Sequence, residues 1–398
     1  MENNVSDRLN RLSESATIAM SRKSRELQAM GRDIINLSLG EPDFHTPDFI
    51  KEDAKKAIDN NYTKYMAVNG YEDLRESISH KFKRDNNLSY SASQIVVSTG
   101  AKHSIANLVM SLVNPGDEVI IPAPFWVTYI EIVKMVEAIP VIIPTTIEND
   151  FKITDKQLED AITDKTRMVI YSSPCNPTGS VYSKKELESL SKVICKHKKM
   201  IVLSDEIYEH INFVGHHTSL AEFNEIYEQV VTINGVSKAF AMTGWRLGYI
   251  GAPQWIADAC TKIQGQFTSG TSSISQRAAK SAIQASPSVV NEMLEAFKER
   301  RDLVLKLLNE IPGVKTNLPE GAFYVFPNIK SFFGKKCGDI TINNSDDLTM
   351  YILNKANVAL VTGDAFGAPN CIRISYSASN NQLIEALRRI KEALSKLV

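Results

Sequence analysis

The sequence has no long apolar run. No stretch approaches the roughly 18 uninterrupted apolar residues of a membrane-spanning helix. The opening segment, MENNVSDRLNRLSESATIAM, carries acids and amides where a secretory signal would have a basic end followed by an apolar block. We therefore expect a cytoplasmic protein that does not act at a membrane.

The sequence also lacks an excess of charge of either sign. Lysine and arginine total 45 and aspartate and glutamate total 46, which gives a formal net charge of −1 at pH 7. A general nucleic-acid binder needs a concentrated excess of Lys and Arg to neutralise phosphates. We therefore expect no nucleic-acid partner.

Metal and dinucleotide motifs are absent as well. No two cysteines have the two-residue spacing of metal or redox motifs, and the histidines lack the carboxylate or cysteine spacing of metal ligands. No G-x-G-x-x-G follows any β-rich run, which argues against a nicotinamide-dependent enzyme. We therefore expect reduced, mostly structural thiols at Cys175, Cys195, Cys260, Cys337 and Cys371, and no bound metal.

Short β-rich runs alternate with helical patterns over roughly residues 94 to 250. Several runs are almost continuous in Val and Ile, which is typical of strands buried on both faces of a mostly parallel sheet. The pattern predicts a doubly wound α/β domain. The runs span 94–98, 117–122, 139–144, 167–172, 200–204, 229–234 and 247–251.

The chain of 398 residues is long for one hydrophobic core, so a second domain is expected. Apolar residues spaced as on one helix face continue from Val290 to Ile311, which predicts a long helix ending near Pro312. The segments after it mix short strands and helices. We predict a large domain over 48–288 and a smaller α+β domain built from 1–47 and 289–398.

Chemically varied side chains follow five of the predicted strands. In a doubly wound sheet, ligands bind at the carboxyl ends of the strands, so these side chains are expected to line one crevice. They are Thr99, Gly100, Ala101 and Lys102; Phe125 and Trp126; Asn176 in CNPTG; Asp205 and Tyr208 in SDEIY; and Ser237 and Lys238 in NGVSK.

One part of this crevice would hold an aromatic aldehyde. Lys238 can form a Schiff base with the aldehyde, Asp205 can pair with a protonated ring nitrogen, and Trp126 can stack on the ring. Asn176 and Tyr208 can hydrogen-bond a ring oxygen. Taken singly, Lys238 is a loop lysine, Asp205 a helix N-cap and Trp126 a core residue, so the interpretation depends on their combination.

The other part of the crevice would hold a phosphate. A small turn at Gly100 and Ala101 opens a helix whose N–H groups can bind an anion, and Ser237 and Arg246 add a hydroxyl and a guanidinium. Pyridoxal 5′-phosphate carries an aldehyde, a pyridine nitrogen, a ring oxygen and a phosphate. The sequence therefore predicts this cofactor.

The motifs also resemble those of a known family. GVSKAFAMTGWRLG is similar to the lysine signature of the class I aminotransferases, which are fold-type I pyridoxal-phosphate enzymes. Five further segments occur in the family's order across nearly the whole chain: NLSLGEPDF, TKYMAVNGYEDLR, SPCNPTG, SDEIYE and CIRISYS. The segment SATIA near the start is similar to that of the bacterial aspartate aminotransferase branch. The resemblance implies a mostly parallel seven-stranded sheet plus a smaller α+β domain.

The resemblance assigns roles to further residues. Lys238, Asp205 and Tyr208 would be the catalytic residues, and Arg373 would bind the substrate α-carboxylate with Trp126, Asn176 and the backbone at Gly40. The phosphate site of Gly100, Ala101, Lys102, Ser237 and Arg246 would be completed by Tyr65 of the partner subunit. The resemblance also implies a homodimer with shared active sites. Its implied reaction moves an amino group from an amino acid to a 2-oxo acid by a ping-pong mechanism.

The resemblance also bears on substrate choice. The stretch QGQFTSGTSSISQ contains no arginine where vertebrate-like aspartate aminotransferases have one for the side-chain carboxylate. Lys102, with Ser15 and Thr17 nearby, resembles the substitute used in the bacterial branch. Aspartate with 2-oxoglutarate is therefore the expected substrate pair. Arg32 resembles prephenate-using members of that branch, whereas Ser13 stands where those members carry a basic residue.

Other functions stay open at this point. The same cofactor chemistry would serve an aminotransferase for aromatic or neutral amino acids or prephenate, or a C–S lyase. A pyridoxal-phosphate-binding regulator is a further alternative, but such a protein would need a DNA-binding extension, and no basic module of about 60 residues precedes the predicted fold.

Overall fold

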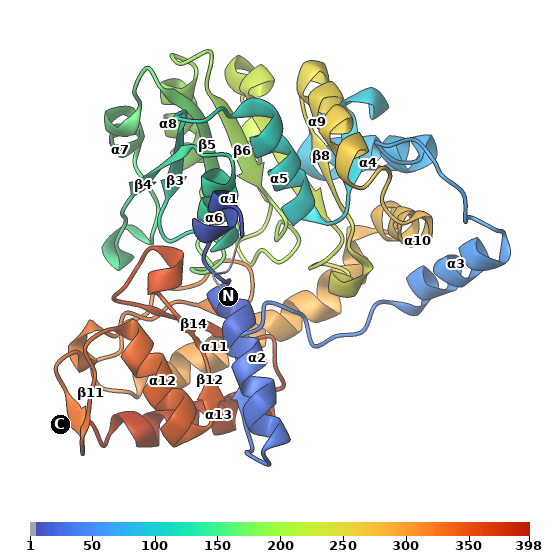
Figure 1. Cartoon of the computed structure of the whole chain (residues 1–398). Helices are drawn as coiled ribbons and strands as arrows, with labels where there is room; N and C mark the ends of the chain where they lie inside the picture. The colour runs from blue at the N-terminus through green and yellow to red at the C-terminus, as the bar shows by residue number, and fades with distance from the viewer. Residues whose placement is uncertain (1–4) are drawn as a thin grey trace.

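The computed structural model describes residues 5–398. Figure 1 shows two lobes: the upper one is built on a large sheet, and the lower one contains the N-terminal helix α2 and the C-terminal third of the chain. The lobes meet along the lower edge of the large sheet. The long helix α11 (Asn291–Asn309) runs from beneath the upper lobe into the lower lobe. This edge is where the candidate site lies.

The large sheet has seven strands in the order β2-β8-β7-β6-β5-β3-β4. All neighbouring pairs are parallel except those of β8, which runs antiparallel to β2 and β7. The prediction of a mostly parallel seven-stranded sheet is therefore confirmed. The strands are β2 (Ile95–Ser98), β3 (Glu118–Pro122), β4 (Ile139–Ile143), β5 (Thr166–Ser172), β6 (Ile201–Asp205), β7 (Val230–Gly235) and β8 (Gly248–Gly251).

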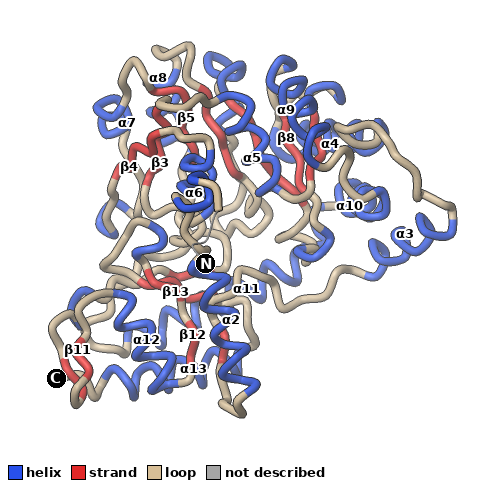
Figure 2. Tube along the Cα trace, viewed as in Figure 1, coloured by secondary structure: helices blue, strands red, loops and turns tan. Residues whose placement is uncertain are grey.

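Helices cover both faces of this sheet, as Figure 2 shows. Successive strand residues point to opposite faces, so Val119 and Ile121 join one hydrophobic cluster while Ile120 joins the other. The first cluster includes residues of α5 (Ala101–Leu112), α6 (Thr128–Met135) and α9 (Gln254–Phe267). The second includes residues of α3 (Asp48–Asp59), α4 (Glu72–Asn86), α7 (Asp155–Ala161), α8 (Lys184–Ile194) and α10 (Ser273–Gln284).

The lower lobe has its own core. Three helices, α11, α12 (Ser345–Ala356) and α13 (Asn380–Leu394), pack around small sheets with the orders β13-β14-β9 and β1-β12. The remaining elements are α1 (Asp7–Asn10), α2 (Ala16–Ala29), β1 (Ile35–Asn36), β9 (Tyr324–Val325), β10 (Lys336–Cys337), β11 (Ile340–Thr341), β12 (Val358–Ala359), β13 (Val361–Thr362) and β14 (Ile372–Ser375).

The two lobes are not independent in their packing. Tyr208 and Ile211, which follow β6 in the upper lobe, belong to the same core cluster as Phe323 and Tyr324 of the lower lobe. Domain limits after residues 47 and 288 therefore stay a prediction. Within residues 5–398, no helix combines the length and the apolar character needed to cross a bilayer.

Candidate active site

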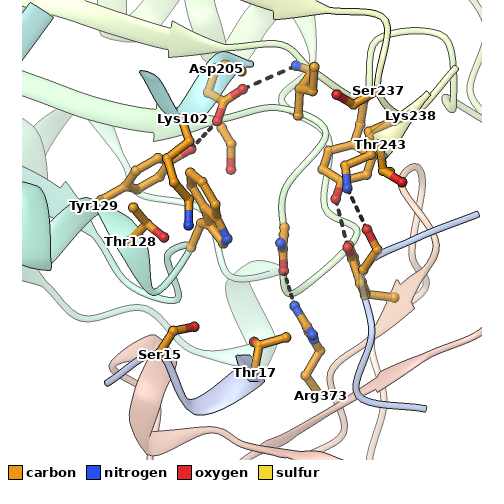
Figure 3. Close-up of a pocket in the computed structure, with 18 of the residues that line it drawn as sticks. Ser15, Thr17, Lys102, Thr128, Tyr129, Asp205, Ser237, Lys238, Thr243 and Arg373 are labelled. Atoms are coloured by element: carbon orange, nitrogen blue, oxygen red, sulfur yellow. Dashed lines mark hydrogen bonds between the residues drawn. The ribbon is translucent and has the colours of Figure 1, made fainter. Parts of the chain in front are cut away.

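A cavity of about 280 Å³ opens where the carboxyl ends of the sheet strands face the lower lobe. Figure 3 shows side chains from both lobes pointing into it. Most of the residues singled out from the sequence line this cavity. These are Ser15, Thr17, Gly40, Ala101, Lys102, Trp126, Asn176, Asp205, Tyr208, Ser237, Lys238, Arg246 and Arg373.

Lys238 follows β7 and directs its amine toward the lower lobe. The amine donates a hydrogen bond to the Gly40 carbonyl oxygen at 2.5 Å and lies 5.6 Å from the centre of the Tyr208 ring. Burial lowers the pKa of Lys238 to about 8, and the positive charge of Arg373 acts in the same direction. The amine is therefore neutral far more often near pH 7 than a solvated lysine, as a nucleophile or a base must be.

Asp205 is the last residue of β6 and is 4% exposed. Its carboxylate accepts hydrogen bonds from the Tyr129 hydroxyl at 2.6 Å and the Ile207 N–H at 3.3 Å (Figure 3). Burial raises the pKa of Asp205 to about 6, although the Tyr129 hydrogen bond opposes the rise. A buried anion of this kind favours a ligand that brings a cationic N–H to it.

Tyr129 was missed in the sequence analysis. It lies three residues after Trp126 in the first turn of α6, where its N–H donates to the Trp126 carbonyl oxygen at 2.9 Å and the two rings meet edge to face. The helical pattern after Trp126 therefore contained the information needed to place Tyr129 in the same cavity.

Arg373 on β14 is a buried guanidinium with incomplete pairing. It donates to Asn176 Oδ1 at 3.0 Å and to the Ser38 carbonyl oxygen at 2.5 Å, and it stacks 4.6 Å from the Tyr324 ring centre. Its Nε finds no hydrogen-bond partner within residues 5–398. Burial also lowers the pKa of Arg373. A buried guanidinium that meets no carboxylate within residues 5–398 is costly, so this arrangement favours a bound carboxylate.

The start of α5 forms the opposite end of the cavity. Gly100 is its N-cap with φ of 84°, a conformation that glycine adopts without strain. The first N–H groups of a helix have no intrahelical acceptor, and the helix dipole favours an anion there. Ser237 and Arg246 line the cavity beside Ala101, and Arg246 Nη1 donates to the Thr243 carbonyl oxygen at 2.9 Å. These groups suit a phosphate.

Lys102 is the next residue along α5. Its amine lies 5.0 Å from the centre of the Trp126 ring. Burial and the nearby Arg246 lower the pKa of Lys102, and no carboxylate of the described chain counters them. Ser15, which precedes α2, and Thr17 lie on the lower-lobe side of the same cavity (Figure 3). The cation is therefore free to meet an anionic ligand.

Five residues from the sequence analysis do not line the cavity. Phe125, which was expected in the same crevice, packs in the hydrophobic core, and Thr99 donates from Oγ1 to Thr271 Oγ1 at 3.1 Å. Gly100 lies just behind it, where the Arg246 guanidinium packs against its backbone. Tyr65 is 99% exposed. Arg32 lies in the lower lobe, where it donates to Asn357 Oδ1 at 3.0 Å and to the Asn354 carbonyl oxygen at 3.0 Å near the end of α12.

The charges of the cavity are unbalanced. Its lining contains four cationic side chains and one carboxylate, Asp205. The cations stand at both ends of the cavity. Lys102 and Arg246 lie near the start of α5, and Lys238 and Arg373 lie toward the lower lobe. Such a site favours a ligand with several negative charges.

Comparison with known proteins agrees with this geometry. Residues 32–390 match the family described as aminotransferase class I and II. The chain belongs to this family. It is 49% identical over 395 residues to a bifunctional aspartate aminotransferase and glutamate/aspartate-prephenate aminotransferase of Petunia hybrida, covering 98% of this chain and 82% of that protein. It is 44% identical to an aspartate/prephenate aminotransferase of Nitrosomonas europaea, covering 98% and 100%.

Solved structures give the same result. The aspartate aminotransferase of Rhizobium meliloti superposes with a TM-score of 0.96 at 39% identity, covering 99% of this chain and all of that one. The aspartate aminotransferase of Thermus thermophilus with maleate superposes with a TM-score of 0.91 at 36% identity, covering 98% and 100%. The fold is therefore that of the fold-type I pyridoxal-phosphate aminotransferases.

The cofactor of this aminotransferase is pyridoxal 5′-phosphate. The residues of the cavity fit it. The helix start at Gly100 with Arg246 suits the phosphate, the buried carboxylate of Asp205 suits a protonated pyridine nitrogen, and the amine of Lys238 suits the aldehyde.

Proposed function

We propose that this aminotransferase moves the amino group of aspartate to a 2-oxo acid, with 2-oxoglutarate as the preferred acceptor. The observation that carries the proposal is a pair of cations that line the same cavity, Arg373 and Lys102, neither of which has a carboxylate partner within residues 5–398. An amino acid with two carboxylates can satisfy both. The names of the relatives, and the dicarboxylate maleate in the Thermus thermophilus structure, agree with this choice.

The cofactor, when bound, supplies the electron sink that makes the substrate Cα proton acidic. Lys238 would hold the cofactor through its amine, and the same amine would move the proton at the substrate Cα. Its pKa of about 8 leaves a useful neutral fraction near neutral pH. Asp205 would keep the pyridine nitrogen protonated, and Tyr129 donates a hydrogen bond to the Asp205 carboxylate.

The remaining residues bind and orient. Asn176 and Tyr208 would hydrogen-bond the ring oxygen, and Trp126 would stack on the ring. The substrate α-carboxylate would bind Arg373 and Asn176 beside Gly40. Lys102, with Ser15 and Thr17, would bind the side-chain carboxylate.

We also propose a homodimer with shared active sites. The supporting observation is Tyr65, an aromatic side chain that is 99% exposed in the single chain. A side chain this open is free to reach into the cavity of a neighbouring subunit. In the proposal the hydroxyl of Tyr65 contacts the phosphate in the partner's cavity. Sedimentation of wild type and Tyr65→Phe tests the dimer, and cofactor affinity tests the contact.

Prephenate is a second candidate substrate because it appears in the names of the Petunia hybrida and Nitrosomonas europaea relatives. Arg32, the residue that resembled the prephenate-using members, is held against the end of α12 and does not reach the cavity. The choice of prephenate therefore has to be measured directly.

The proposed function is tested with one panel. Aspartate, alanine and phenylalanine are supplied as donors to 2-oxoglutarate, prephenate is supplied as an alternative acceptor, and the products are analysed. A 2-oxo acid with no ammonia identifies transamination, whereas ammonia identifies a lyase. Aspartate should give the highest kcat/KM, and Lys238→Ala is the matched inactive control. Cell fractionation tests the expected cytoplasmic location.

A further inference from the structure

Tyr324 is a buried side chain of the cavity that the functions above do not use. It lies on β9 in the lower lobe and is fully buried. Its hydroxyl lies 2.7 Å from the hydroxyl of Tyr208, which follows β6 in the upper lobe. This hydrogen bond therefore joins the two lobes at the group that is proposed to bind the ring oxygen of the cofactor.

The surroundings hold the Tyr324 hydroxyl in one place. A methyl group on Gly40 would overlap the Tyr324 hydroxyl, so glycine at this position makes room for it. The Arg373 guanidinium lies 4.6 Å from the centre of the Tyr324 ring, and the Tyr208 and Tyr324 rings meet edge to face. The hydroxyl thus has little freedom to leave Tyr208.

The direction of the hydrogen bond follows from the number of protons. Burial raises the pKa of both phenols, so each keeps its single proton at physiological pH. The ring oxygen of the cofactor carries negative charge and is a stronger acceptor than a phenol. When the Tyr208 hydroxyl donates its hydrogen bond to that oxygen, the Tyr324 hydroxyl must be the donor to Tyr208.

We infer that Tyr324 is a positioning residue that acts through Tyr208: it donates a hydrogen bond to the Tyr208 hydroxyl and so strengthens the hydrogen bond from Tyr208 to the ring oxygen of the cofactor. Consecutive hydrogen bonds polarise one another, by about 10 to 30% per bond. The inference rests on the proposed placement of the ring oxygen against Tyr208. Its consequence is that the lower lobe helps set the protonation of the cofactor.

The test is the pH at which the visible spectrum of the bound cofactor changes. A donor to the ring oxygen stabilises the deprotonated form, so its loss should raise this midpoint. Losing a hydrogen bond to a charged group shifts the pKa of that group by about 1 to 2 units. Tyr208→Phe should therefore raise the pH midpoint by that amount. Tyr324→Phe keeps the ring and should raise it by about 0.1 to 0.6 unit, which is 10 to 30% of the Tyr208 effect.

A control variant separates this role from a loss of stability. Tyr351 on α12 is a buried tyrosine whose hydroxyl donates to the Ala393 carbonyl oxygen at 2.9 Å, outside the cavity. Tyr351→Phe should lower the unfolding temperature of the apoprotein about as much as Tyr324→Phe while leaving the spectral midpoint unchanged. The charged groups that face the two phenols, Lys238, Arg373 and Asp205, are the same in both variants.

A double variant distinguishes the possible failures. If Tyr324 acts through Tyr208, the Tyr324→Phe shift should vanish in a Tyr208→Phe background. An unchanged shift in that background, or no shift in the single variant, overturns the inference while leaving the proposed function intact. No shift with Tyr208→Phe itself would overturn both the inference and the proposed placement of the ring.

Discussion

Replacing Lys102 by methionine should selectively weaken the use of aspartate. Methionine keeps the length and packing of the side chain against Trp126 but removes the charge. Arg373, which is proposed to bind the α-carboxylate that all amino acids share, lies at the other end of the cavity and is unchanged. The loss should therefore fall on donors with a second carboxylate.

The size of the effect follows from the surroundings of the amine. Breaking a buried charge pair costs about 2 to 5 kcal/mol, whereas exposed pairs contribute about 0.2 to 1 kcal/mol. The Lys102 side chain is exposed in the single chain, although its amine is enclosed enough to have a lowered pKa. A cost of about 1 to 3 kcal/mol is therefore expected, which is a 5-fold to 150-fold loss in kcat/KM for aspartate.

The assay is steady-state kinetics of the holoenzyme with aspartate, glutamate, alanine and phenylalanine as donors. Lys262→Met, on α9 and outside the cavity, is the matched control and should leave all four values unchanged. An equal loss for all four donors with Lys102→Met would show that Lys102 supports the cofactor. No loss for aspartate would refute the assignment of Lys102 to the side-chain carboxylate.

Three further changes have defined outcomes. Burial raises the pKa of Asp205 in the folded protein to about 6 from 3.8, so its ionisation lowers the free energy of unfolding as the pH rises through 6. The free energy of unfolding of the Asp205→Asn apoprotein should exceed that of wild type by about 1 to 3 kcal/mol at pH 7. A gain that persists at pH 4 would contradict this. Arg373→Lys loses two-point binding and should raise KM for aspartate and alanine alike by about 10-fold to 100-fold; an effect on aspartate alone would count against the α-carboxylate role. Gly248→Ala places a methyl group against the Ala101 backbone at the start of α5. It should lower the free energy of unfolding by about 1 to 3 kcal/mol and weaken cofactor binding, as calorimetry and titration can measure. The control Gly265→Ala, on α9, adds a methyl group with only ordinary van der Waals contacts and should do neither.

The large sheet was predictable because its signal is local. Buried strands rich in Val and Ile stand out between amphipathic helices, and each of the seven predicted runs matches a strand to within about a residue or two at either end. The rule that ligands bind at the carboxyl ends of strands then brought together Trp126, Asn176, Asp205 and Lys238, which the structure places in one cavity.

The contribution of the lower lobe was much harder to predict. The run AFYVF, which contains Tyr324, is readable as a short strand, but no local pattern indicates that Tyr324 meets Tyr208 across 116 positions of sequence. Arg373 and Gly40 were placed only by resemblance to the family, because no local pattern indicates that they face the large sheet. Arg32 resembles the prephenate-using members of the branch, but its guanidinium donates to the backbone at the end of α12, so the use of prephenate stays a prediction.

The most direct test of the account is to find the lysine that carries the cofactor. The purified holoenzyme is reduced with borohydride, digested, and mapped by mass spectrometry. The mass of the reduced cofactor should appear on Lys238, whose buried amine has a pKa lowered to about 8. Label on Lys102 or on a lysine outside the cavity, with Lys238 unmodified, would contradict it.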